Sequence, residues 1–347
     1  MRSQKLLLTI ALFFLFTTLS FAQDLSTPVG YMDAFAKEHD KMNKTYMAYQ
    51  SAVAHGKRAK KVEKLRQKVV ETINDTRNNT RGLGAYKGDN SLRESSVEYI
   101  TLVYHVFNDD YAKIVNMEDV IERSYDQMEA YINLQEMTDE KLRQASQKMN
   151  VAEKAFAEKY NIKLIDDKSE LSQKMATAAK LNHYKNKIFL VFFKCNWQDA
   201  VITEAMNNKK VNDIEQARNA LIKYVDEGLL ALDTLKSFNG DASLAMATRQ
   251  VLSFYKRTAE NDLPKLTDFY LKQENFEKIK KAFDAKPESK RTKEDIDAFN
   301  KAVNEVNAAI NSFNQTNNKV NQGRKQVLDN YEKAEKEFSD RNMPYFK

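Results

Sequence analysis

The sequence predicts an all-α protein, and three observations carry that prediction. Only eight glycines and four prolines occur in 347 residues, so few positions interrupt a helix. Apolar residues recur at three- and four-residue steps, for instance along Leu92–Val115, and this spacing makes one apolar stripe on a helix. Alternation with a period of two, which is typical of strands, is not sustained anywhere in the sequence.

A sequence pattern that occurs twice indicates an internal duplication. The segment 88–92 (GDNSL) recurs as segment 240–244 (GDASL), 152 residues later. The same offset aligns the pair Glu63 and Arg66 with a second Glu and Arg. Because a period of this length indicates a duplicated domain and not a solenoid, we expect two tandem, similar up-and-down bundles of four to five helices each.

Apolar spacing and capping residues place the helices within each expected bundle. In the first bundle, residues 23–165, the predicted helices are Tyr31–His55, Lys57–Asn79, Ser91–Asn116, Met117–Glu136 and Asp139–Tyr160. In the second bundle, residues 166–347, they are Leu171–Asn207, Val211–Phe238, Ala242–Asn261, Asp262–Asp284 and Lys293–Ser339. Pro264 is expected to end the third helix of the second bundle, because proline cannot donate a helical hydrogen bond.

The first 22 residues have the three parts of a secretory signal peptide. Arg2 and Lys5 precede an apolar stretch, Leu6–Leu19, and the stretch ends in Ser20-Phe21-Ala22 with small residues where signal peptidase reads. We expect cleavage after Ala22. No later stretch approaches the roughly 20 apolar residues that a membrane span needs. The mature chain is therefore expected to be exported, to the periplasm, the cell surface or the medium, without a transmembrane segment.

Charge and cysteine content exclude some partner classes. Removing residues 1–22 removes Arg2 and Lys5 and no acidic residue, so the net charge falls from +6 to +4. Lysines and arginines are scattered among acidic residues, which argues against nucleic acid as a partner. The one cysteine, Cys195, excludes an intrachain disulfide and lies too far from the cleavage site to carry a lipid. Release or peripheral membrane contact is favoured over an acyl anchor.

The duplicated motif has a structural interpretation and a catalytic alternative. Gly88 and Gly240 can adopt a positive φ that ends the preceding turn. The side chains of Asp89, Ser91, Asp241 and Ser243 can then cap the helix that follows. Gly-Asp-x-Ser also occurs in the nucleophile block of some lipases and esterases. That reading needs a histidine base and a strand before the motif, and neither is indicated here.

No motif predicts a metal or a cofactor. The four histidines are His39, His55, His105 and His183, and none has a glutamate three residues before it, as a di-iron bundle requires. No Cys/His zinc spacing and no glycine-rich phosphate loop occur. We therefore predict no catalytic residue, no metal site and no cofactor.

The most apolar stretch of the mature chain is Ile188–Phe193, followed by Cys195 and the single tryptophan, Trp197. Six consecutive apolar residues leave no polar helix face, so the stretch is either buried or used to contact an apolar partner. Burial is expected, and Cys195 is then an inert core thiol.

Three blocks of the first bundle resemble a known group of proteins. Tyr86-Lys87-Gly88-Asp89, Thr138-Asp139-Glu140 and Ala155–Asn161 look like the conserved blocks of an uncharacterised family of exported helical surface proteins of spirochaetes and bacteroidete-type bacteria. The resemblance covers residues 27–165 best. It implies location and architecture but no reaction. Many members are lipoproteins, and this chain departs from them because it lacks a cysteine beside the signal peptide.

These observations lead to one expected function and one alternative. We expect a non-enzymatic binding or spacing module in the cell envelope or at the cell surface, whose partner is an envelope or extracellular protein or polymer. The alternative is a carrier that holds an apolar, lipid-like ligand inside a bundle or between the bundles.

Overall fold

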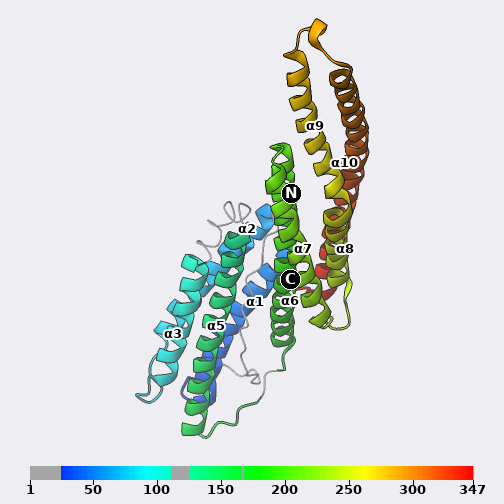
Figure 1. The fold of residues 1–347 in the computed structure, drawn as a ribbon. Helices are drawn as coiled ribbons and strands as arrows, with labels where there is room; N and C mark the ends of the chain where they lie inside the picture. Colours follow the sequence, from blue (N-terminus) through cyan, green and yellow to red (C-terminus); the bar gives the residue numbers. More distant parts are fainter. Residues whose placement is uncertain (1–24, 111–124, 166–167, 347) are drawn as a thin grey trace. The chain divides into compact units, whose positions relative to one another are not determined.

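The computed structural model describes residues 25–110, 125–165 and 168–346 (Figure 1). Every regular element in these ranges is helical, so the all-α prediction is confirmed. None of the described helices is long and apolar enough to cross a bilayer. The predicted signal peptide, residues 1–22, lies outside the described residues.

The chain forms two compact units. Unit 1 comprises the described residues up to Lys187 together with those from Lys336 onward, and unit 2 comprises Ile188–Glu335. The division falls inside two helices, α6 (Glu170–Asn207) and α10 (Lys293–Asn342). The predicted boundary between residues 165 and 166 precedes α6 and stays a prediction, because it concerns the duplicated sequence and not the packing of the chain.

Unit 1 is built on four helices that pack in chain order. They are α1 (Pro28–Ala54), α2 (Ala59–Gly82), α3 (Ser91–His105) and α5 (Tyr125–Lys159). Helix α1 packs on α2, α2 on α3, and α3 on α5. Tyr31 at the start of α1 stacks on Phe156 near the end of α5, with ring centroids 5.6 Å apart. The first and last helices of the series are therefore antiparallel neighbours.

Helix α5 corrects one predicted break. The sequence placed a helix end at Glu136 and a new start at Asp139, but α5 runs without interruption from Tyr125 to Lys159. Thr138 does not cap a new helix, because its hydroxyl donates to the carbonyl of Leu134 four residues earlier, at 2.8 Å. The predicted helix end at Asn116 falls in residues 111–124, which lie outside the described residues.

The start of α6 and the end of the chain complete unit 1. Tyr184 of α6 stacks on Phe338 of α10, and Lys185 donates to the hydroxyl of Ser339 at 2.6 Å. Beyond α10, the ring of Tyr345 stacks on His55 with centroids 3.6 Å apart. These contacts bind the C-terminal residues to the end of α1.

Unit 2 contains the rest of α6 and α10 with three further helices. These are α7 (Val211–Thr234), α8 (Ser243–Arg257) and α9 (Leu263–Asp284). Between α8 and α9 lies a π-helical turn, Thr258–Asp262, in which the N–H of Leu263 donates to the carbonyl of Thr258, five residues back. The predicted end of the helix before Pro264 is therefore a π turn and not a break. The wider turn precedes the proline, which has no N–H to donate.

Helix bounds in the two units coincide at the offset of the repeated motif. Helix α2 begins at residue 59 and ends at 82, and α7 begins at 211 and ends at 234. Helices α3 and α8 both have 15 residues, and a five-residue π turn follows each, at Val106–Asp110 and Thr258–Asp262. All these bounds differ by 152 residues.

Helices α9 and α10 form a hairpin arm in unit 2, here defined as residues 269–313 (Figure 1). Phe269 packs on Phe313 with centroids 4.7 Å apart, and Phe283 stacks on Phe299 at 4.5 Å. The side chains of α10 that turn inward follow steps of three and four residues: Phe299, Ala302, Val306, Ala309, Phe313, Thr316 and Val320. This heptad spacing is the pattern by which two helices pair along a seam.

The apolar stretch at the start of unit 2 contributes to its core. Ile188, Phe192, Phe193 and Cys195 are buried, and Phe192 stacks on Tyr331 of α10 with centroids 3.9 Å apart. Burial raises the pKa of the Cys195 thiol to about 12. The thiol is therefore protonated near neutral pH and a weak nucleophile.

Candidate functional site

The first copy of the duplicated motif forms a tight turn at the start of α3. Lys87 and Gly88 have positive φ values of 50° and 84°. Tyr86 and Asp89 exchange two backbone hydrogen bonds, and Asp89 Oδ1 accepts the N–H of Ser91 at 2.9 Å. Ser91 contributes its backbone N–H to this turn as the first residue of the helix.

The second copy repeats this geometry at the start of α8. Asn239 and Gly240 have φ values of 50° and 86°, and Phe238 and Asp241 exchange the same two backbone bonds. Asp241 Oδ1 accepts the N–H of Ser243 at 2.9 Å. In both copies an aspartate side chain satisfies a backbone donor that the helix itself leaves without a carbonyl partner. The contacts favour the helix-start interpretation of the motif.

Asp89 also joins the end of α5 to the motif. Its Oδ2 accepts a hydrogen bond from Lys159 Nζ at 2.7 Å and one from the Tyr160 hydroxyl at 3.2 Å. The Lys159 contact and the Ser91 N–H hold the pKa of the Asp89 carboxyl well below its usual range. Lys159 is mostly exposed, so this pair orients the chain more than it stabilises it.

The histidines contact groups other than the motif serines. Buried His39 lies 3.0 Å from the Ser96 hydroxyl, and desolvation lowers its pKa to about 3, so the ring is neutral. His105 pairs with Asp109 at 2.7 Å, and His183 faces Glu136 at 3.7 Å. No group of three or more potential metal ligands is found among the described residues.

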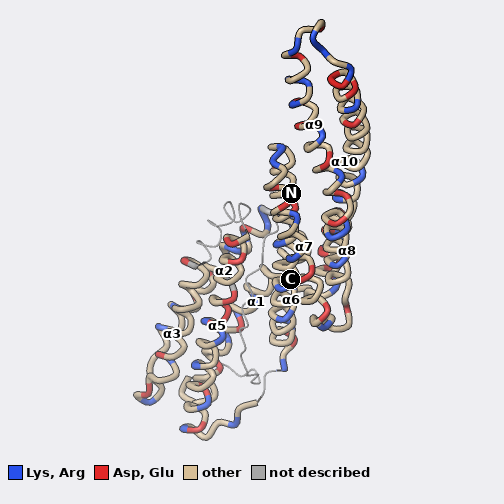
Figure 2. The backbone as a smooth tube through the Cα atoms, viewed as in Figure 1, with Lys and Arg blue, Asp and Glu red and all other residues tan. Residues whose placement is uncertain are grey.

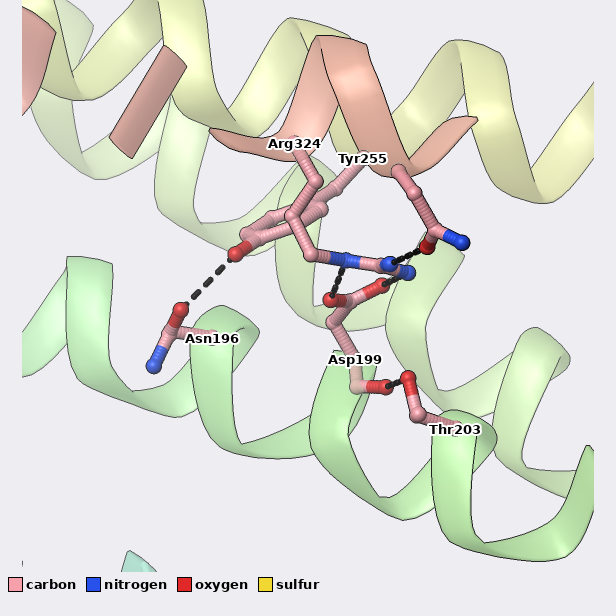
Figure 3. Close-up of polar contacts among 6 residues, drawn as sticks. Asn196, Asp199, Thr203, Tyr255 and Arg324 are labelled. Carbon is pink, nitrogen blue, oxygen red and sulfur yellow. Dashed lines mark hydrogen bonds and ion pairs between the residues drawn. The ribbon is translucent and has the colours of Figure 1, made fainter. Parts of the chain in front are cut away.

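An ion pair joins α6 and α10 in unit 2 (Figure 3), with its carboxylate buried and its guanidinium half-buried. Arg324 of α10 donates to both carboxylate oxygens of Asp199 of α6, at 2.6 and 3.0 Å. The Tyr255 ring of α8 lies beside the guanidinium, and its hydroxyl donates to Asn196 Oδ1 at 2.8 Å. The carbonyl of Asp199 accepts the hydroxyl of Thr203 at 3.0 Å. Helix α6 is thus hydrogen-bonded to α8 through Asn196 and to α10 through Asp199.

The Asp199–Arg324 pair is suited to fixing helix positions. Burial raises the pKa of Asp199, and the guanidinium acts in the opposite direction. Burial also raises the pKa of Tyr255 well above its usual value. Because both charged groups of the pair already bond to each other in a parallel, two-bond arrangement, they are occupied in holding the helices together.

Two of the hollows in unit 1 are lined by described residues. One, of about 150 Å³, is lined by Ser95, Glu98, Tyr99, Leu102, Lys141, Gln144, Ala145, Lys148 and Met149. The other, of about 40 Å³, is lined by Val29, Met32, Asp33, Phe35, Ala36, Leu92, Glu153, Ile162, Lys163, Leu164 and Ile165. Glu153 is only 6% exposed, and burial raises its pKa to about 8. Both volumes are below the roughly 300 Å³ of ligand pockets.

Comparison with known proteins gives no relative for this chain. No family model, no curated protein and no solved structure matches it.

Sequence reasoning did not find the Asp199–Arg324 pair or the buried glutamate. Asp199 and Arg324 are 125 residues apart, and Glu153 lies on a helix with many acidic residues. One local signal existed for Glu153, because it lies between apolar Met149 and Phe156 on the buried face of α5.

Proposed function

We propose that this protein is an exported, non-enzymatic binding or spacing module of the bacterial cell envelope or surface, and that the α9–α10 arm is its contact element. The observation that carries the proposal is the arm itself. Over residues 276–299 the seam side chains of α9 and α10 are only half-buried, so two helices are held together with little core.

The arm has the features of a stiff contact element. The seam residues, spaced by three and four positions along α10, keep the two helices in register. At the start of α10, Thr292 and Asp295 form a cap with two reciprocal hydrogen bonds, at 2.9 and 3.3 Å. Lys286 also bonds to Asp295 at 2.5 Å, which closes the loop. A helical rise of 1.5 Å per residue gives each arm helix a length of about 20 to 30 Å.

One side of the arm leaves apolar side chains in solvent. Ile296 and Ile310 of α10 are 44% and 38% exposed, and half-buried Val303 lies midway between them at a seven-residue spacing. Basic and acidic residues both occur along the two arm helices (Figure 2). An apolar stripe within a mixed-charge surface favours a protein or polymer partner over a nucleic acid.

The carrier alternative has less support. The two hollows that described residues of unit 1 line, about 40 and 150 Å³, are too small for a lipid-like ligand, which typically fills 300 Å³ or more. The long helix faces are better suited to binding another macromolecule.

We also propose that the two predicted bundles, residues 23–165 and 166–347, descend from one duplicated bundle. The equal helix bounds, the paired π turns and the identical motif geometry at a 152-residue offset support this origin.

The resemblance to exported helical surface proteins supports the proposed location. Protein recovered from its own host should begin at Gln23, and an uncleaved chain retained in the cytoplasm would contradict export.

Photocrosslinking in the native host tests the arm. A photoreactive residue at exposed Asn307, between Val303 and Ile310, should crosslink to one envelope or extracellular component. The matched control carries the same residue at Lys223 on α7, whose side chain is 73% exposed but lies outside the arm. Equal crosslinking from both positions, or none from Asn307, would refute the arm as contact element.

A further inference from the structure

The smaller hollow of unit 1 is lined by α1, α3, α5 and the segment that follows α5. Asp33 comes from α1, Glu153 from α5, and Lys163 from the segment that follows α5. The remaining lining residues are apolar: Val29, Met32, Phe35, Ala36, Leu92, Ile162, Leu164 and Ile165. The hollow is therefore an apolar cup with two acidic groups and one basic group.

Glu153 is buried in this wall without a charge partner. Its side chain is 6% exposed, and among the described residues no hydrogen bond or ion pair engages the carboxyl. Burial of a carboxylate without a cation costs several kcal/mol, so the group is held mostly neutral near pH 7. A cation of suitable size in the hollow would remove that cost.

The size and rim of the hollow limit what can enter. A volume of about 40 Å³ is about three times the ~10–15 Å³ of cavity volume that one water molecule requires, so only a small headgroup fits. At the rim, Val29 and Ile165 are 42% and 59% exposed, unusually open for large apolar side chains. An apolar stem could lie against them while a cationic head reaches the carboxyl.

We propose that this hollow binds a primary ammonium group on a short alkyl stem, with Glu153 as its counter-ion. This is the chemistry of a lysine side chain and of a free alkylamine. Asp33 adds a second negative charge, and Lys163 opposes the cation. The buried Tyr99, whose pKa is raised by burial and by Glu153, stays neutral. The inference concerns unit 1 and does not depend on the arm.

Proton linkage gives the proposal a specific signature. The cation binds the ionised carboxylate, so binding releases the Glu153 proton below pH 8. The dissociation constant should fall about tenfold per pH unit between pH 6 and 8 and then level off, because an alkylammonium stays protonated to about pH 10. Binding driven only by the apolar wall would show no such dependence.

The test titrates the full mature chain with n-butylammonium and follows the methyl NMR signals of Met32, Ile162 and Ile165. Saturable shifts with the pH dependence above are expected, with n-butanol as the uncharged control. Glu153→Gln should lose both the binding and its pH dependence, whereas Glu158→Gln, on the same helix but exposed, should keep both. Lys163→Met should tighten binding at every pH.

Two peptide probes separate the sources of the ammonium group. A blocked Gly-Lys-Gly peptide should shift the same signals if a partner's lysine can enter, and its acetyl-lysine form should not. Shifts with butylammonium alone would restrict the site to free amines. Equal shifts with butanol, a pH-independent affinity, or unchanged binding by Glu153→Gln would each overturn the proposal.

Discussion

Replacing Glu153 by glutamine should stabilise unit 1 at neutral and alkaline pH. The glutamine has nearly the same shape as the acid but never ionises. In the folded protein the pKa of Glu153 is about 8, against an ordinary value of 4.5. The folded state therefore holds a proton that the unfolded chain has lost between these two pH values, and the free energy of unfolding falls as pH rises through that window.

The size of the effect follows from the two pKa values. Between pH 4.5 and 8, the free energy of unfolding of the wild type falls by about 1.4 kcal/mol for each pH unit. Above pH 8 it is therefore about 5 kcal/mol lower than at pH 4. His39 acts in the opposite direction: its pKa is lowered to about 3, so stability falls as pH drops below 6.5. This histidine contribution is present in both proteins and cancels in their difference.

Urea unfolding of both proteins at half-unit steps from pH 4 to 9, followed by circular dichroism, measures the difference. Hydrogen exchange of α1 and α5 assigns it to unit 1. The free energy of unfolding of the variant minus that of the wild type should increase by about 1.4 kcal/mol per pH unit between pH 4.5 and 8. Above pH 8 this difference should stay constant. A difference that stays constant across this range would refute the reasoning, because it would mean that Glu153 is not desolvated in the folded protein.

Three further predictions concern unit 2. Gly228→Ala should lower the free energy of unfolding by about 1–3 kcal/mol in a denaturant titration, because a Cβ there would lie 2.8 Å from a Leu252 methyl. The control Gly82→Ala, whose Cβ would have nothing within 4 Å, should not lower it. Equal effects of the two changes would contradict this prediction. Asp199→Asn should cost about 1–3 kcal/mol in denaturant unfolding, since it removes the carboxylate that accepts two hydrogen bonds from the half-buried Arg324 guanidinium, whereas Asp329→Asn in an exposed pair should change stability by less than 1 kcal/mol. The Cys195 thiol should react with a disulfide reagent only after unfolding, and rapid labelling of the native protein would show that it is accessible.

The fold could be predicted from the sequence where local rules decide. Helical spacing located most helices, and the glycine-aspartate motif marked the starts of α3 and α8, because a positive φ and a short acceptor side chain are encoded within five residues. The rules failed between Glu136 and Asp139, where the predicted break does not occur, and before Pro264. A threonine can cap a helix or bond back into one, and a π turn can precede a proline; nearby sequence does not distinguish these outcomes.

The polar groups of the interior could not be predicted in the same way. Whether Glu153 is solvated depends on α1 and on the segment after α5, and whether Asp199 has a partner depends on a helix 125 residues away. Their burial is a property of packing between helices. The arm lies between these cases. Its heptad spacing can be read from the sequence of α10, whereas the half-buried state of its seam over residues 276–299 is seen only in the folded chain.

Shortening the arm tests its role most directly. Deleting residues 273–279 of α9 together with 303–309 of α10 removes seven residues from each helix, so the seam register is kept and the arm shortens by about 10 Å. The shortened protein should be exported and folded, with an unchanged unfolding midpoint for unit 1. A chemical crosslinker, which needs no photoreactive residue in the deleted segment, should recover at least tenfold less partner in the native host. Recovery of the same partner in equal amount would contradict the claim that the protein acts through its arm.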